Sequence, residues 1–206
     1  LDEDIHTALT LAPPHISIYH LTLEPNTVFA KFPPVIPEDD MAYAMLDRLT
    51  ELTAVSGLNR YEVSAYARAG HRCWHNLNYW QFGDYLGIGA GAHSKLSFAH
   101  RVVRQVRYRD PRGYMEHALA GQAVTQEDEV ARADLPFEFM LNALRLRDGF
   151  ALKDFTARTG LPITSIQAAL ATAEDKGLIE RDFTHVRPTV RGFDFLSDLQ
   201  SIFLPQ

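Results

Sequence analysis

The sequence has one cysteine, Cys73, among its 206 residues. A single thiol allows no disulfide within the chain and no metal site built from several cysteines. No apolar run is long enough to cross a bilayer, so the sequence predicts no integral membrane segment. The first residues have no secretory character, and we therefore expect a cytoplasmic protein.

Positive charge is also scarce. The chain carries 20 lysines and arginines against 26 aspartates and glutamates, a formal net charge of −6. This charge opposes broad contact with phosphate backbones, and we expect no nucleic-acid partner. Hydrophobic residues make up 46% of the chain and charged residues 22%, which is typical of an ordinary globular protein.

The first 124 residues mix strand and helix patterns. A helix is expected to begin after Pro37, where Glu38, Asp39 and Asp40 suit its positive end, and to stop at Gly57. Alternation of apolar and polar residues marks several strands. We predict strands over residues 15–23, 61–66, 85–88 and 101–108, and further helices over residues 2–11 and 111–120.

From about Thr125 the pattern becomes helical. We predict helices over residues 127–144, 152–159 and 163–176, a hairpin over 177–188 and a last helix over 189–203. Three helices, a hairpin and a final helix follow the order of a winged helix. We therefore predict two domains, residues 1–124 and residues 125–206.

A winged helix suggests DNA binding, because its third helix often enters a major groove. Residues 125–206, however, hold 9 lysines and arginines against 13 aspartates and glutamates. Neutralising phosphates needs the opposite balance. We therefore expect a helical docking module, with nucleic-acid binding as the alternative.

The only basic cluster is formed by Arg101, Arg104, Arg107, Arg109 and Arg112. On an alternating strand Arg104 lies on the face opposite to Arg101, Arg107 and Arg109. We expect a solvated edge strand whose charges prevent further pairing. Binding of a propionate or a phosphate is the alternative.

Residues 75–80 (HNLNYW) combine polar donors with large flat rings, which suits a pocket for a planar ligand. On a helix, His75 and Tyr79 share a face, and Asn76 and Trp80 form the next row. An imidazole beside aromatic walls is a reasonable haem ligand, with Cys73 and His71 as further ligand candidates. The competing interpretation is that His75 and Asn76 cap a buried helix whose Trp80 fills the core.

Three blocks resemble consecutive segments of one protein family. They are residues 15–27 (HISIYHLTLEPNT), 61–67 (YEVSAYA) and 75–93 (HNLNYWQFGDYLGIGAGAH). They resemble the radical S-adenosylmethionine proteins related to oxygen-independent coproporphyrinogen III oxidase. Residues 63–66 (VSAY) and the HNxxYW pattern are similar to its haem-chaperone branch.

The resemblance implies an α/β fold: the C-terminal remnant of a partial radical-SAM (β/α) barrel, then a mostly helical winged-helix-like domain. Residues 15–23 would be the last barrel strand. The family binds a [4Fe-4S] cluster through a CxxxCxxC motif that this sequence lacks. Cluster and S-adenosylmethionine are thus implied for a full-length protein only, and we do not expect catalysis by this chain alone.

The resemblance also implies a function, namely binding haem and delivering it to haem-accepting proteins. The implied haem contacts are His75, which would bind the iron, and Asn76, Tyr79 and Trp80. Contacts to S-adenosylmethionine would come from Thr22, Ala92 and His93. Oxidation of coproporphyrinogen III in haem biosynthesis is the alternative activity, and winged-helix nucleic-acid binding is the second alternative.

Overall fold

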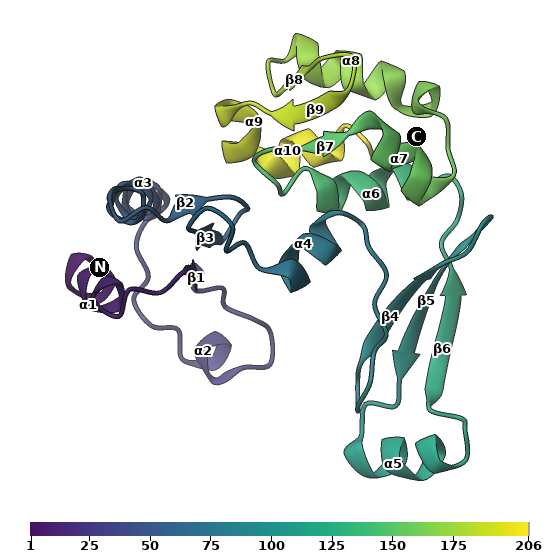
Figure 1. The fold of residues 1–206 in the computed structure, drawn as a ribbon. Coiled ribbons are helices and arrows are strands. Elements are labelled where there is room, and N and C mark those ends of the chain that lie inside the picture. The colour runs from purple at the N-terminus through teal and green to yellow at the C-terminus, as the bar shows by residue number, and fades with distance from the viewer. Residues whose placement is uncertain (206) are drawn as a thin grey trace. The chain divides into compact units, whose positions relative to one another are not determined.

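The computed structural model describes residues 1–205 (Figure 1). The chain divides into two compact units, which we call unit 1–73 and unit 74–206. Each unit is described by itself. The fold mixes α and β structure, as the sequence predicts, and every helix in the described chain is too short or too polar to cross a bilayer. The predicted domain boundary after residue 124 stays a prediction.

Unit 1–73 packs two helices against a small antiparallel sheet with the strand order β1-β3-β2. Its elements are α1 (Asp2–Thr10), β1 (His15–Ser17), α2 (Val28–Lys31), α3 (Asp39–Val55), β2 (Asn59–Arg60) and β3 (Ala65–Ala67). Ile5, Leu49, Leu58 and Tyr66 form its buried core. The predicted helices α1 and α3 are confirmed.

The predicted strand over residues 15–23 is much shorter than expected. Only His15–Ser17 forms strand β1, and it pairs antiparallel with β3. The amide of Ile18 still bonds to the Ser64 carbonyl at 2.9 Å, and no regular pairing follows. Residues 1–205 contain no barrel, because parallel barrel neighbours for β1 do not occur among them. The assignment of β1 to a barrel therefore remains a hypothesis.

The predicted strand over residues 61–66 is a tight hairpin instead. Strand β2 ends at Arg60, and the amide of Tyr61 bonds back to the carbonyl of Ala65 at 3.1 Å. Inside the turn, the buried Glu62 carboxylate accepts hydrogen bonds from the backbone N–H and the hydroxyl of Ser64. A local side-chain bond of this kind competes with strand pairing.

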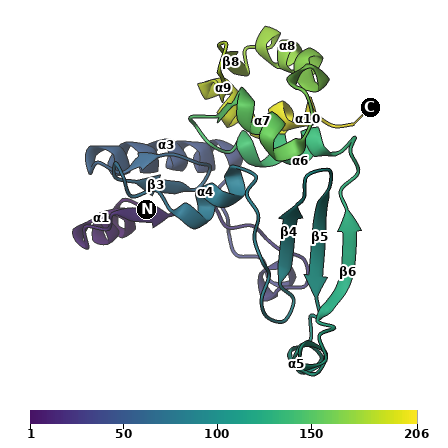
Figure 2. The same cartoon turned by 45° about the vertical axis from the view of Figure 1, so that its right-hand side comes forward.

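Unit 74–206 begins with helix α4 and an antiparallel sheet in the order β4-β5-β6, whose strands lie side by side in Figure 2. The elements are α4 (Trp74–Trp80), β4 (His93–Ser97), β5 (Val102–Arg107), α5 (Pro111–Leu119) and β6 (Val124–Glu129). Asp110 caps α5 by accepting a bond from the Gly113 amide at 2.7 Å. Strand β5 and helix α5 confirm the sequence prediction.

Two predictions for this sheet are wrong. Residues Glu127, Asp128 and Glu129 were expected to begin a helix, but they belong to strand β6. Strand β5 was expected at an edge, yet it is the central strand. Acidic β6 pairs with basic β5: Asp128 lies opposite Arg104, the side chains of Arg101 and Glu129 form an ion pair at 4.0 Å, and residues 125–129 stay exposed to solvent.

A third expected strand, residues 85–88, is reduced to a single bridge between Tyr85 and Lys95. The glycine-rich segment after it runs as a loop outside the sheet. Gly87 needs to be a glycine, because a Cβ there would overlap the backbone of His93. The backbone of residue 87 and the backbone of His93 therefore approach each other more closely than a residue with a side chain would allow.

The remaining residues follow the predicted order of three helices, a hairpin and a final helical segment. The elements are α6 (Leu135–Ala143), β7 (Phe150–Ala151), α7 (Leu152–Thr159), η1 (Ile163–Ile166), α8 (Gln167–Asp175), β8 (Ile179–Arg181), β9 (His185–Pro188), α9 (Val190–Asp194) and α10 (Leu196–Ser201). Strand β7, which the sequence did not predict, joins the hairpin in the order β7-β9-β8. The predicted last helix is split at Phe195.

The core of unit 74–206 gathers around three aromatic rings. Phe139 lies edge to face with Phe150 at 5.1 Å and with Phe155 at 5.3 Å between ring centroids. Phe82, from the turn after α4, joins this core and meets Phe139 at 5.7 Å. The turn that follows α4 is therefore anchored in the same core as the C-terminal helices.

Candidate functional site

Helix α4 carries the four residues that the sequence predicts as haem contacts. His75 and Tyr79 lie on one face, with ring centroids 4.8 Å apart and an interplanar angle of 74°. Tyr79 in turn lies 4.5 Å from Tyr85, which follows the helix. We call His75, Tyr79 and Tyr85 the aromatic row. His75 is exposed and both tyrosines are half-buried, so the row offers an imidazole to solvent and rings beside it.

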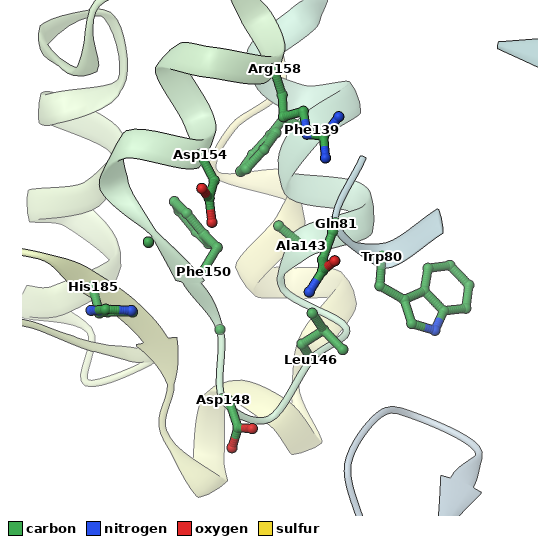
Figure 3. A pocket seen from close by; sticks show the side chains of 12 residues that line it. Trp80, Gln81, Phe139, Ala143, Leu146, Asp148, Phe150, Asp154, Arg158 and His185 are labelled. Carbon is green, nitrogen blue, oxygen red and sulfur yellow. The ribbon is translucent and has the colours of Figure 1, made fainter. Parts of the chain in front are cut away.

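Trp80 occupies a different environment. The Arg145 guanidinium lies 4.2 Å from the centroid of its ring system, and the indole Nε1 is buried with no hydrogen-bond partner among the described residues. Trp80 also borders a cavity of about 340 Å³ together with Phe139 and Leu146. Figure 3 shows Trp80 and Gln81 toward one side of this cavity and His185 toward the other. Trp80 therefore packs α4 onto the rest of the unit.

The end of α4 is fixed by a pair of backbone bonds typical of a Schellman motif. The amide of Phe82 bonds to the Tyr79 carbonyl at 2.9 Å, and the amide of Gly83 bonds to the Asn78 carbonyl at 2.7 Å. Phe82 takes the left-handed conformation with φ of 55°, which costs an L residue about 1–2 kcal/mol. Full burial of the Phe82 ring offsets this cost, since burying a large apolar side chain stabilises by about 1.5–3 kcal/mol.

Gly83 is required at this motif for a steric reason. A Cβ at Gly83 would overlap both the side chain and the carbonyl of Asn78. The Asn78 amide nitrogen is already occupied, because it donates to the Asp84 carbonyl at 2.9 Å. The segment from Asn78 to Asp84 is thus closely packed and holds one backbone geometry.

A buried charge network follows directly. Lys95 on β4 is 2% exposed, and its ammonium donates to the Phe82 carbonyl at 3.0 Å, to Asp84 Oδ1 at 3.0 Å and to Ser97 Oγ at 2.9 Å. Burial lowers the pKa of Lys95, and the attraction of Asp84 offsets this only in part. Burial acts to raise the pKa of Asp84, but hydrogen bonds from Ser97 and Lys95 outweigh it, so that pKa lies below its ordinary value.

The predicted contacts to S-adenosylmethionine fall in both units. Thr22 is exposed in unit 1–73, outside any helix or strand. In unit 74–206, the Ala92 carbonyl accepts a bond from the Arg107 amide at 2.9 Å, and His93 is exposed at the start of β4. Their grouping around one ligand stays a prediction.

The donor set does not fit a [4Fe-4S] cluster. Cys73 is the only thiol, and a CxxxCxxC site needs three thiolates. The Cys73 amide donates to the Tyr61 hydroxyl at 3.3 Å, and its neighbour His71 is exposed. Any cluster ligands must therefore come from outside this sequence.

Tyr85, Asp84 and Lys95 contact helix α4 or the turn that ends it, but they were not predicted as part of the site. Tyr85 was expected only as the first residue of a strand. A lysine in the middle of a short strand reads as a solvated side chain, and the sequence has no periodic signal that marks Lys95 as buried. Only the proximity of Asp84 to the HNLNYW segment pointed toward the site.

Comparison with known proteins finds similar sequences over nearly the whole chain. Residues 130–195 match the family described as the HemN C-terminal domain. The heme chaperone HemW of Escherichia coli strain K12 is 40% identical over 204 residues, which cover 98% of this chain and 53% of that protein. HemW of Haemophilus influenzae is 40% identical over 205 residues, covering 99% of this chain and 52% of that protein.

The fold comparison agrees with the sequence comparison. The structure of coproporphyrinogen III oxidase (HemN) from Escherichia coli, described as a radical SAM enzyme, matches with a TM-score of 0.72 at 15% identity. The match covers 98% of this chain and 50% of that one. This chain spans about half the length of the curated relatives it matches. It is therefore homologous to the C-terminal half of the HemW haem chaperones, and its fold matches half of the HemN structure.

Proposed function

We propose that this chain binds haem through His75 and belongs to a cytoplasmic protein that delivers haem to haem-accepting proteins. The observation that carries the proposal is the aromatic row, in which an exposed imidazole lies edge to face with Tyr79, and Tyr79 contacts the tilted ring of Tyr85. Imidazole nitrogen is a common axial ligand of haem iron, and flat rings suit the porphyrin. The relatives named as heme chaperones support the same assignment.

The four predicted contacts then have different tasks. His75 holds the iron, and Tyr79 lies beside it on the same face of α4. Asn76, half-buried in the neighbouring row, holds the porphyrin edge or a propionate. Trp80, packed under Arg145, supports the helix and offers the porphyrin at most an edge of its ring.

An exposed ligand suits delivery better than storage. A haem that is buried on all sides gains much apolar contact and leaves slowly, because most differences in affinity appear in the dissociation rate. A haem held by one side chain on an exposed helix face keeps an open side that a recipient can approach. The location of His75 at the surface thus supports transfer to a second protein.

The S-adenosylmethionine contacts remain part of the proposal. In a full-length protein with a cluster-binding N-terminal half, Thr22, Ala92 and His93 would contact that cofactor. The residues of this chain alone do not supply the cluster that the chemistry of S-adenosylmethionine needs in this family.

The test is a haem titration of the parent chain and of two matched histidine variants. His75→Ala is expected to weaken haem binding at least 10-fold while leaving the melting temperature unchanged, because the side chain is exposed. His100→Ala, at an exposed histidine in the loop between β4 and β5, serves as the control and should bind as the parent does. Equal binding by His75→Ala and the parent would overturn the assignment and make Cys73 and His71 the next ligands to test.

A further inference from the structure

We propose that Lys95 is a positioning residue for haem binding, an inference that rests on the proposed function. Lys95 does not reach the exposed face of α4. Its buried ammonium instead holds the turn that ends the helix, and its backbone holds Tyr85. Lys95, a residue of strand β4, therefore fixes the position of the aromatic row without lying on its exposed face.

The side chain of Lys95 acts on the turn. All three ammonium donors are used, on Phe82, Asp84 and Ser97, and the nitrogen also lies 3.9 Å from the centroid of the Phe82 ring. Two of these partners belong to the segment that directly follows α4. Phe82 is in the strained left-handed conformation, which sets the direction of its carbonyl group. The hydrogen bond from the Lys95 ammonium holds the carbonyl in that direction.

The backbone of Lys95 acts on the row itself. The Tyr85 amide bonds to the Lys95 carbonyl at 3.0 Å, and the Lys95 amide bonds to the Tyr85 carbonyl at 3.1 Å. This bridge places the Tyr85 ring 4.5 Å from Tyr79, which contacts His75. Lys95 is thus linked to His75 through two intervening rings.

A core position does not require this charge. An apolar side chain of similar length would fill the same space, and burying an ammonium is unfavourable unless it is fully paired. Here it is fully paired, and Asp84 in addition accepts the backbone and hydroxyl bonds of Ser97 at 2.9 and 2.7 Å. The hydrogen bonds of this network join β4 to the turn that ends α4. Because hydrogen bonds are directional, they fix the orientation of that turn, which apolar packing alone would not.

The experiment compares haem spectra of purified, folded variants of this chain. Lys95→Met keeps an unbranched side chain that is one atom shorter and removes the charge. We expect its ferric haem spectrum to differ from the parent's and its haem dissociation constant to rise at least 10-fold, because His75 and Tyr79 are no longer held in one arrangement. Lys153→Met, at an exposed lysine of α7, is the control and should reproduce the parent spectrum and affinity.

A second, milder variant keeps the test valid if Lys95→Met fails to fold. Asp84→Asn keeps the shape of a carboxyl that is 41% exposed, and it should shift the spectrum in the same direction by a smaller amount. Parent-like spectra for either folded variant at the network would overturn the role of Lys95. If instead His75→Ala binds as the parent does, the proposed function is wrong, and this inference falls with it.

Discussion

The two compact units bury apolar surface very differently. Unit 74–206 encloses the Phe139, Phe150 and Phe155 rings in one large core, whereas the core of unit 1–73 is small. Both units expose large apolar side chains, and those of unit 1–73 are concentrated within residues 11–36: Leu11, Tyr19, Leu21, Val28, Phe29, Phe32, Val35 and Ile36. Because apolar stabilisation scales with the buried area, unit 74–206 should be the more stable one, and unit 1–73 should open first.

The largest expected effect comes from the centre of the larger core. Phe139→Ala removes a ring that is 1% exposed and meets three other phenylalanines, so it should lower the free energy of unfolding by about 3–5 kcal/mol. Denaturant unfolding measures this loss. Phe183→Ala, at a ring that is 103% exposed, is the control and should change stability by less than about 0.5 kcal/mol. Similar losses for both variants would contradict the assigned core.

A core substitution in the smaller unit sharpens the comparison. Leu49, on α3, is 3% exposed and packs in the core that α3 shares with α1. Leu49→Ala should lower the free energy of unfolding by about 2–4 kcal/mol, less than Phe139→Ala does. Hydrogen exchange should then rise across residues 1–73 and stay unchanged in residues 74–206. A uniform rise across the whole chain would mean that the two units unfold together.

The sequence predicted elements best where one local signal decides them. Helix α5 begins with an aspartate cap and a proline, and the hairpin β8–β9 follows Gly177, so both could be located from the residues alone. Strand β7 was missed because Phe150–Ala151 is only two residues long and pairs with β9, which is far along the chain. Strand β6 was mistaken for a helix start because acidic residues also favour the first turn of a helix, whereas its pairing with β5 depends on residues that are distant in the sequence.

The residues of the candidate site also fall into those that a local pattern predicts and those that it does not. The helical spacing of His75 and Tyr79 was enough to place them on one face, and the ring contact confirms it. The contribution of Tyr85 and Lys95 was beyond prediction, since both depend on a left-handed turn at Phe82, a conformation that an aromatic residue seldom adopts. Tertiary burial of Phe82 selects that turn, and no local pattern encodes it.

The smallest expected effect concerns the turn of the hairpin β8–β9. Hydrogen bonds from the Thr184 hydroxyl and amide and from the His185 amide lower the pKa of Asp182 from 3.8 to about 2. A carboxyl whose pKa is depressed by folding stabilises the fold above its unfolded pKa, and this contribution is lost as the pH falls toward about 2.

Melting temperatures of the parent and of Asp182→Asn test this expectation. The parent should melt at a slightly higher temperature than the variant from pH 5 upward, and the difference should disappear as the pH is lowered from 4 toward about 2. A difference that stays constant over this pH range would show that the charge of Asp182 does not stabilise the turn.

Helix α4 and the turn that ends it also combine buried and exposed side chains. Trp80 and the adjoining Phe82 face the interior and hold the helix in place, whereas His75 faces solvent and contributes little to packing. Substitutions on the inner side should therefore affect stability, and substitutions of His75 should affect haem binding alone. The proposed function requires that His75 itself ligates the iron.

Exchanging the ligand atom tests that claim most directly. The variant His75→Cys, measured as the ferric haem complex by absorption and electron paramagnetic resonance, replaces an imidazole nitrogen with a thiolate sulfur at an exposed position. We expect the parent's spectrum to be replaced by that of a thiolate-ligated ferric haem, with the melting temperature unchanged. A His75→Cys spectrum identical to that of the parent would show that the iron is held elsewhere and would contradict the account.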